Sequence, residues 1–490
     1  MRIFRALTPV FALSLGALWS GSAYAGEATR IATAAEEDNP FDFHFGASYA
    51  FDYKKAAILR EFTQDGGNRL GRDLMYYQQR QTVNVAMEIG IYRNLSLYVE
   101  LPVVVADNRA YAFDKESGDC VYPNDITPTG SLTTSDINCV DKTNSSTIRD
   151  GIIPRNGFDA RNPSSAYTEF TSEDTKRIFN GPTRKGIDQL HVGIKYGILD
   201  QDKQPHLPTW ILGLEGRFAI GRPMEFSRNI AIDEPKSNTS VGRGTHELGV
   251  WTALSRRYRF LEPFFGAHWR YAFRASNTTF QKFADMDVTN PQSTTGLYVG
   301  AEFIPWENKA KQQKFSITLM GTADLNYGGR AYSEVWELLA DSPALVGTYA
   351  PGAGECNVQE ALAYAGSNPT DPVGFYDAAN AAPNSGDCRK FEGITDVDDF
   401  ARFGLRAAMN FHLGKYARLN FGADVKTDTQ HFLTNANRGD PEAFGDPQIV
   451  EGDEVGVNPV RRDVVDNVGR RYAISNVFNV VGFTNFLLTF

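Results

Sequence analysis

Residues 41–53 alternate strictly between two kinds of side chain. The odd positions hold Phe41, Phe43, Phe45, Ala47, Tyr49, Phe51 and Tyr53, and the even positions hold Asp42, His44, Gly46, Ser48, Ala50 and Asp52. Because successive side chains of a strand point to opposite faces, this run predicts a strand with one apolar face and one polar or small face. The run is also long enough to cross a bilayer when tilted.

The same alternation recurs along the chain and predicts twelve strands. They lie at 41–53, 83–91, 95–103, 190–198, 210–220, 247–254, 261–273, 297–303, 315–327, 404–413, 417–426 and 478–490. The alternation is weakest in the last segment, where Val481, Phe483 and Leu487 share a face with asparagines. Outside the N-terminus no run of about 18 apolar residues occurs, so no transmembrane helix is expected.

The connectors between these segments alternate in length. Arg93-Asn94 and Gly414-Lys415 are among the short ones, and every second connector is long, including the stretch between 53 and 83. Outer-membrane barrels have short periplasmic turns and long extracellular loops. The sequence therefore predicts an all-β fold, a twelve-stranded antiparallel up-and-down transmembrane β-barrel over residues 41–490. A soluble sandwich also alternates, but it does not explain this rhythm of loop lengths.

The N-terminus indicates export. Arg2 and Arg5 precede an apolar run at 10–19, and Ala23-Tyr24-Ala25 matches the small-x-small cleavage pattern. We expect a cleaved signal peptide at 1–25, a periplasmic segment or partial plug at 26–40, and a location in the outer membrane of a Gram-negative bacterium. The net charge of −10 and the lack of a basic patch argue against nucleic acid as a partner.

The four cysteines fall into two local pairs within polar, loop-like sequence. Four cysteines allow three connectivities, and their spacing favours Cys120–Cys139 together with Cys356–Cys388. Both pairs lie in long connectors, which this topology places outside the cell. Disulfides there suit an oxidising compartment.

Charged residues occupy only the small or polar face of the predicted strands, and that face would line a pore. The candidate pore-lining residues are Asp42, His44, Asp52, Glu88, Glu100, Lys195, Glu215, Arg217, Glu247, Glu262, His268, Arg270, Glu302, Asp324, Arg406, His412, Arg418, Asp424 and Lys426. Acids outnumber bases in this set, and carboxylate rings favour cations. We therefore expect passive diffusion of small solutes, neutral or cationic and including hydrophobic ones, through a narrow charged lumen. A cation-attracting wall is expected at Asp42, Asp52, Glu88 and Glu100. The alternative is that acids and bases on neighbouring strands pair and close the lumen.

The last residues, Phe486-Leu-Leu-Thr-Phe490, resemble the C-terminal signature of bacterial outer-membrane β-barrels. That resemblance implies contact with membrane lipid and recognition of the last strand by the envelope machinery that inserts barrels. Residues 186–223 are similar to the MetA-pathway (phenol degradation) outer-membrane transporter family, although Gly186-Ile187-Asp188 stands where that family has Gly-x-Gly-Asp. This likeness implies a transporter-like barrel.

Two other functions are alternatives to a channel. A lipid hydrolase needs a lipid-facing Ser–His pair, whereas His44, His191, His268 and His412 share the inward parity; only His246 has the outward parity, beside loop residues. No cofactor, metal or enzymatic activity is expected. A surface adhesin would bind a partner through its long loops. The segment 333–340, Ser-Glu-Val-Trp-Glu-Leu-Leu-Ala, predicts a short helix that caps the barrel, narrows it or meets a partner.

Overall fold

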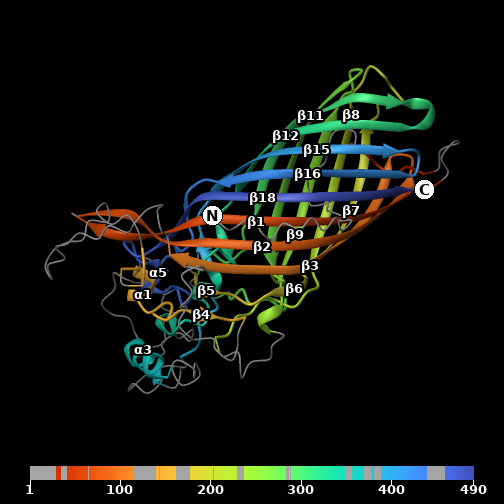
Figure 1. Ribbon diagram of the computed structural model, residues 1–490. Coiled ribbons are helices and arrows are strands. Elements are labelled where there is room, and N and C mark those ends of the chain that lie inside the picture. The colour runs from red at the N-terminus through yellow and green to blue at the C-terminus, as the bar shows by residue number, and fades with distance from the viewer. Residues whose placement is uncertain are drawn as a thin grey trace.

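The computed structural model is a closed barrel of long antiparallel strands (Figure 1). It describes residues 29–34, 41–64, 66–113, 140–142, 144–161, 177–201, 203–228, 237–282, 286, 288–347, 356–368, 378–379, 388–438 and 458–490. The barrel strands are β1 (Phe43–Gln64), β2 (Gly67–Tyr92), β3 (Leu95–Phe113), β7 (Gln189–Leu199), β8 (Thr209–Ala219), β9 (Thr245–Ser255), β10 (Leu261–Arg274), β11 (Thr294–Asn308), β12 (Gln313–Asn326), β15 (Phe400–Leu413), β16 (Ala417–Asp428) and β18 (Tyr472–Thr489). Each overlaps one of the twelve alternating segments, so the predicted fold class and strand count are confirmed.

The barrel closes between its first and last strands. β1 pairs with β2 along one edge and with β18 along the other, and the remaining strands follow chain order between β2 and β18. At the seam the Phe490 amide donates to the Phe43 carbonyl at 2.9 Å, and the Phe43 amide donates back at 3.2 Å. Both terminal strands are therefore paired on both sides.

The two faces of the barrel wall differ as the alternation predicts. On β2, Val85, Met87 and Ile91 are exposed, whereas Glu88 between them is 1% exposed. On β12 and β15 the outward Leu319 and Leu405 are 61% and 73% exposed. An apolar outer face and a polar inner face are the arrangement of a barrel that stands in lipid. No helix in the described part of the chain is long and apolar enough to span a membrane.

Several large aromatic residues lie exposed on the outer face of the barrel. Trp210 and Trp306 are exposed near the end of the barrel that carries the short turns. Trp269 and Tyr271 are exposed farther along β10 and stack with ring centroids 6.2 Å apart. This placement agrees with the two aromatic girdles of membrane barrels.

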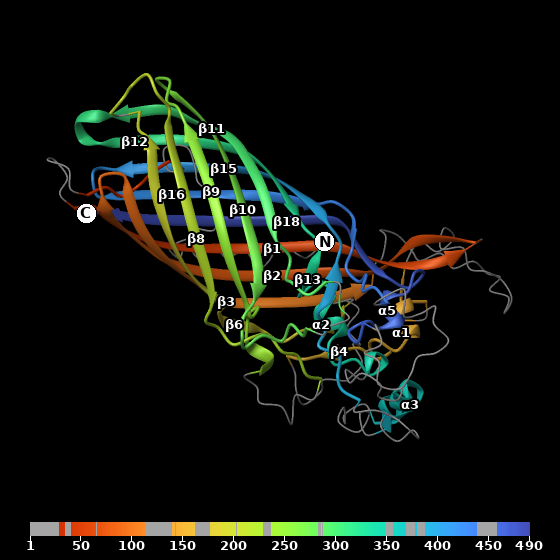
Figure 2. The ribbon, with the colours of Figure 1, turned by 180° about the vertical axis from the view of Figure 1, so that it is seen from behind.

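The first connector differs from the expectation. Residues 54–82 were expected to form a long loop, but they extend β1 and β2 into one hairpin whose ladder runs to Gln64 and Gly67. The turn contains Gly66 at φ 76°, as two-residue hairpins with Gly require. The alternation fades in this part because a ribbon beyond the bilayer needs no uniformly apolar face. The hairpin projects past the barrel end in Figure 2.

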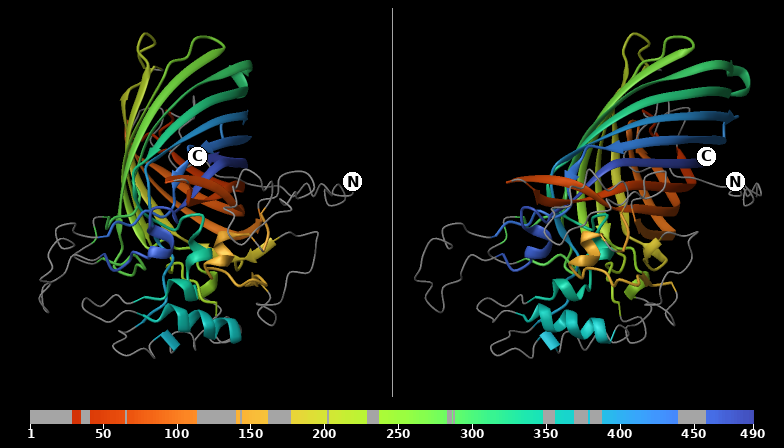
Figure 3. Two further views of the ribbon diagram at one scale, coloured as in Figure 1. Left: turned by 90° about the vertical axis from the view of Figure 1, so that its left-hand side faces the viewer. Right: turned by 60° about the vertical axis from the view of Figure 1, so that its left-hand side comes forward.

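The other long connectors fold together at the end of the barrel opposite the short turns, and we call this part the cap (Figures 1 and 3). It consists of the described residues between β3 and β7, β8 and β9, β10 and β11, β12 and β15, and β16 and β18. Its short elements are α1 (Ser146–Arg149), β4 (Phe158–Asp159), β5 (Arg177–Asn180), β6 (Arg184–Ile187), η2 (Ser237–Thr239), β13 (Gly329–Ala331), α2 (Trp336–Leu339), η4 (Pro343–Leu345), α3 (Val358–Ser367), β14 (Thr395–Val397), β17 (His431–Phe432) and α5 (Asp463–Asp466). The short turn between β11 and β12 carries η3 (Lys309–Lys311).

The largest hydrophobic core lies at the cap end of the molecule. Its fully buried members include Ile58 on β1, Phe158 on β4, Trp336 on α2 and Tyr472 on β18. The segment 333–340 contains the expected helix, but the helix itself spans only Trp336–Leu339. All four of its side chains are buried. Of the three placements considered for this segment, it therefore occupies the capping one.

Two predictions concern the cysteines. The Cys356–Cys388 disulfide is present and spans 32 residues of the cap. Cys120 and Cys139 lie outside the described residues, as does the signal peptide predicted at 1–25.

Candidate functional site

The interior of the barrel holds most of the predicted pore-lining side chains. The ones that are nearly fully buried are His44, Glu88, Glu100, Lys195, Glu215, Arg217, Glu247, Glu262, Glu302 and Asp424. Asp42, Asp52, His412 and Arg418 are half-buried. His268, Arg270, Asp324, Arg406 and Lys426 line a cavity with Asp424. Strand alternation alone brings these residues to one face.

Glu88 on β2 is the centre of one polar cluster near the short-turn end. Lys195 Nζ donates to its Oε2 at 2.9 Å, and Ser96 Oγ donates to its Oε1 at 2.7 Å. His44 Nδ1 lies 3.5 Å from the same carboxylate. The expected cation-attracting wall therefore needs correction, because Glu88 is a buried, paired carboxylate. β3, which pairs with β7, is the strand that brings Lys195 within reach.

The other members of that expected wall are also engaged. Asp42 lies 3.1 Å from His44 Nε2, and Asp52 accepts from Asn479 Nδ2 at 2.5 Å. Glu100 Oε1 accepts from Asn84 Nδ2 at 2.7 Å, and its other oxygen lies 3.8 Å from His191 Nδ1. The contacts of Asp52 and Glu100 join neighbouring strands, as in the alternative considered above, whereas Asp42 and His44 are two residues apart in the chain.

Residues 29–34 lie inside the short-turn end of the barrel. The Ala32 amide donates to Glu88 Oε1 at 3.0 Å, and the Thr33 amide donates to Asp42 Oδ2 at 3.3 Å. Thr29 Oγ1 is 2.9 Å from Ser255 Oγ on β9. Because β9 lies several strands away from β2 around the wall, this segment crosses part of the bore. It belongs to the predicted 26–40 segment, of which 26–28 and 35–40 lie outside the described residues.

A second chain of charges runs across β8, β9 and β10. Arg217 Nε donates to Glu215 at 2.5 Å, and its Nη1 lies 3.6 Å from Glu247. Glu247 also lies 3.0 Å from Arg243 Nη2 and 4.0 Å from Arg270 Nη1. Burying a charged side chain is energetically costly unless an opposite charge lies close to it, and these ion pairs offset that cost.

The sequence count of inward charges missed several residues. Lys314 Nζ donates to Glu302 at 2.7 Å. Arg402 donates to both carboxylate oxygens of Asp428, which also lies 3.5 Å from Lys54 Nζ. Lys54, Lys314, Arg402 and Asp428 share the inward parity but lie just beyond the segments recognised in the sequence. These four residues are three bases and one acid, so they reduce the excess of negative charge on the inner face. The expected cation preference rested on that excess.

Aromatic rings pack closely against glycines of the neighbouring strand inside the wall. A Cβ built on Gly266 would lie 2.0 Å from the Tyr298 ring, and one on Gly213 would lie 2.1 Å from the Trp251 ring. Gly193 is covered by Tyr98 in the same way. The inward glycines were visible in the sequence, but the pairing of each with a ring depends on strand register.

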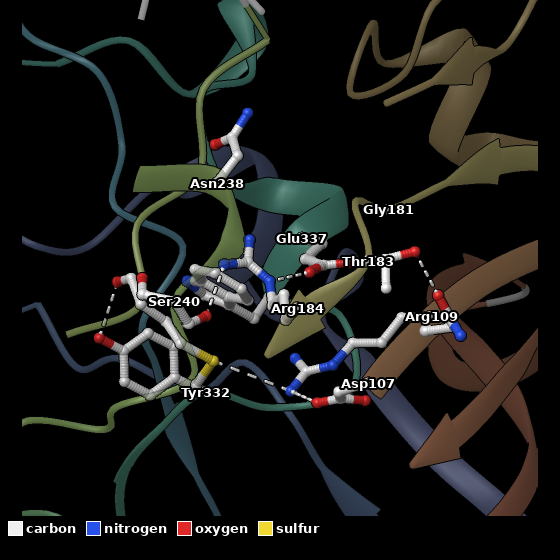
Figure 4. A network of polar contacts seen from close by, with 12 residues as sticks. Asp107, Arg109, Gly181, Thr183, Arg184, Asn238, Ser240, Tyr332 and Glu337 are labelled. Atoms are coloured by element: carbon white, nitrogen blue, oxygen red, sulfur yellow. Dashed lines mark hydrogen bonds and ion pairs between the residues drawn. The ribbon is translucent and has the colours of Figure 1, made fainter. Parts of the chain in front are cut away.

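At the cap end, Arg184 and Glu337 form a buried ion pair beside Trp336 (Figure 4). The Arg184 guanidinium carbon lies 4.6 Å from the Trp336 ring centroid, and that of Arg109 lies 5.7 Å from it. Arg109 in turn donates to Asp107 at 3.2 Å. This network holds α2 against β3 and β6 over the barrel mouth.

A cavity of about 180 Å³ opens among β10, β11, β12, β15 and β16. Its lining combines His268 and Arg270 of β10 with Tyr298 of β11 and the Arg406 and Lys426 side chains of β15 and β16. The cavity lies in the lumen wall, and half of its twelve lining residues are charged.

His246, the histidine with outward parity, has a structural environment. Its Nδ1 accepts from the Ala219 amide at 3.1 Å, and its ring packs between Phe218 and Phe273. Asp396, in the acidic stretch 396–399, lies 3.3 Å from Arg330 Nε.

Comparison with known proteins gives only structural likenesses. No family model matches the sequence, and no curated protein matches it. Among solved structures, an outer membrane channel of the COG4313 group from Pseudomonas putida F1 is 7% identical with a TM-score of 0.34, covering 91% of this chain and 96% of that one.

Two further structures resemble the chain at a similar level. A FadL homologue from Pseudomonas aeruginosa is 8% identical with a TM-score of 0.29, over 91% of this chain and 90% of that one. The outer membrane protease OmpT of Escherichia coli is 7% identical with a TM-score of 0.30, over 92% of this chain and 97% of that one. All three are bacterial outer-membrane proteins. Similarity at this level does not identify what a protein transports or cleaves.

Proposed function

We propose that this protein is a narrow channel that passes small solutes by passive diffusion across the outer membrane of a Gram-negative bacterium. The observation that carries the proposal is the interior of the barrel, where most strands place charged side chains and those of β10, β12, β15 and β16 line a cavity, while the outer face is apolar. A barrel of twelve strands is wider than the eight-stranded barrels that side chains fill. Charged groups in such a lumen are retained where water and polar solutes pass.

The same interior supports a small size limit. Residues 29–34 cross part of the bore at one end, and the cap core covers the other end. Between them, aromatic rings and ion pairs occupy the wall. Large solutes would therefore pass slowly or not at all.

A surface adhesin or structural barrel is the second candidate. The observation in its favour is the cap, which has its own buried core and a disulfide. A rigid folded surface of this kind suits binding of a partner through the loops. A lipid hydrolase is less well supported, because His246 is held between two phenylalanine rings.

Conductance in planar bilayers tests the channel. Full-length protein, refolded and checked by its heat-dependent shift on a gel, should give small discrete current steps. Liposomes containing the protein should swell in the smallest sugars and respond progressively less to larger ones. Heat-unfolded protein at the same concentration serves as the control. Folded protein that gives neither steps nor swelling would overturn the channel and favour the adhesin.

The last strand carries a separate proposal. We infer from the resemblance of residues 486–490 to the outer-membrane signature that the insertion machinery binds β18. Deleting Phe490 should slow assembly in cells, whereas Leu413→Ser on another exposed outer position should not.

A further inference from the structure

We propose that the cavity between β10 and β16 is a binding subsite for a small organic carboxylate. The inference rests on the proposed function, since it names the class of solute that pauses within the channel. It departs from the cation preference expected from the sequence.

The size of the cavity limits the ligand. Its volume of about 180 Å³ is close to that of a cavity that holds one benzene molecule, about 150 Å³. A single small ring with one charged substituent fits this volume, and a disaccharide does not. The wall of the cavity includes Tyr298, which packs with Phe264 and Met320 in an apolar cluster inside the barrel.

The charge of the lining favours an anion. Arg270, Arg402, Arg406 and Lys426 line the cavity with two carboxylates, Asp324 and Asp424, and Arg402 is paired with a third, Asp428, so four cations face three acids. Guanidinium groups present donors in a planar fork that matches a carboxylate. In a partly desolvated lumen this excess of positive charge attracts anions more strongly than it would in bulk water.

The carboxylates present do not compensate these cations equally. Arg406 donates to both oxygens of Asp424, so Lys426, at 3.9 Å from the same carboxylate, receives only a share of it. Glu247 is nearer to Arg217 and Arg243 than to Arg270, which lies 4.0 Å away. Arg270 and Lys426 are therefore the cations of the lining with the most distant counter-charges.

Two donor atoms of lining residues are buried without an acceptor in the described part of the chain. Arg270 Nε and the Tyr298 hydroxyl are buried and have no hydrogen-bond partner among the described residues. Both residues line the cavity. A buried donor without an acceptor is costly, and a carboxylate supplies acceptors for both. Arg270 would hold the charge, and Tyr298 would contact one oxygen and the ring.

Benzoate is a suitable probe, and benzamide is its neutral counterpart. We expect calorimetry on the full-length protein in detergent to detect benzoate binding, with benzamide at least tenfold weaker. Arg270→Gln and Lys426→Gln should each weaken benzoate at least tenfold, and Tyr298→Phe severalfold. Arg93→Gln, at a short turn outside the barrel interior, is the matched control and should bind as the wild type does. All variants must first show the wild-type heat-dependent gel shift.

The possible outcomes separate the two proposals. Equal binding of benzoate and benzamide, or unchanged binding in Arg270→Gln, would overturn the carboxylate subsite. Competition by inorganic phosphate as strong as that by benzoate would show a general oxyanion site and would also overturn it. Current steps without benzoate binding would remove the subsite and leave the channel intact. Benzoate binding without current steps or swelling would remove the channel as proposed here.

Discussion

Arg184 Nε donates to Glu337 Oε1 at 2.6 Å, and neither side chain is exposed to solvent. The remaining guanidinium nitrogens of Arg184 donate to the Ser240 and Glu225 carbonyls. The pair therefore ties α2 to β6 and to the β8–β9 connector within the cap. Trp336, beside the pair, places its ring under the same guanidinium.

Removing one member of this pair should loosen the cap. Glu337→Leu leaves the buried Arg184 charge uncompensated, which costs about 3–5 kcal/mol. We expect limited proteolysis to cut the cap of this variant at protease concentrations that leave the wild type intact. Glu337→Gln is the matched control, because its amide oxygen still accepts from Arg184. Its cap should lose less stability than that of the leucine variant. Equal resistance of the leucine variant and the wild type would contradict a stabilising role for the pair.

The cap should lose stability as the pH rises through the weakly acidic range. Burial raises the pKa of the Asp466 carboxyl from 3.8 to about 7, with Asp396 adding to the rise and Arg461 opposing it. A raised acid pKa means that the folded cap keeps a proton that the unfolded chain releases above about pH 4. Its contribution to stability therefore falls between about pH 4 and 7 and levels off above that range.

Asp466→Asn is the variant that checks this titration. The Ala436 and Arg462 amides donate to the Asp466 carboxyl at 3.0 and 2.8 Å, and an asparagine oxygen can replace only one of these acceptors. Protease should cut the cap of the wild type faster at pH 8 than at pH 5. This difference should be much smaller in the variant. The same pH dependence in both proteins would assign it to another group.

The contact between Gly266 and Tyr298 should tolerate no added methyl group. A Cβ at residue 266 would meet the Tyr298 ring at 2.0 Å, and overpacking of this kind costs about 1–3 kcal/mol. Gly266→Ala should lower the temperature at which the folded band disappears on a gel. Gly482→Ala, where nothing lies within 4 Å, is the control and should behave as the wild type. An unchanged transition in Gly266→Ala would mean that the ring moves freely.

The Cys356–Cys388 disulfide should stabilise one part of the cap without affecting the barrel. Closing a span of 32 residues removes unfolded-chain entropy worth about 4 kcal/mol. We expect the double serine variant to be cut faster within residues 356–388, with the heat transition of the barrel unchanged. Loss of the barrel transition as well would show that this disulfide is required for the whole fold.

The barrel strands were predictable because lipid requires an uninterrupted apolar outer face. Val85 and Met87 on β2 illustrate this, since each alternates with a polar inward residue. The extension of β1 and β2 past residue 53 was missed for the opposite reason. Beyond the bilayer a strand is held by its ladder, here from Lys54↔Gln78 to Gln64↔Gly67, and its side chains need no fixed polarity.

The inward parity of the charged residues was predictable, but their partners were not. Alternation alone places Glu88 on the inner face, whereas its contact with Lys195 joins residues 107 positions apart. That contact depends on which strands are neighbours and on their register. Lys314 and Arg402 were missed because they lie at strand ends, where the pattern was too short to recognise.

The core at the cap end draws its buried members from Ile58 near the start of the barrel to Val477 near its end, with Trp336 between them. No stretch of the chain contains this interior by itself, so it cannot assemble before the first and last strands have met. Contacts so distant in sequence form slowly. A molecule whose cap resists protease has therefore already joined its first and last strands, so this resistance reports closure of the barrel.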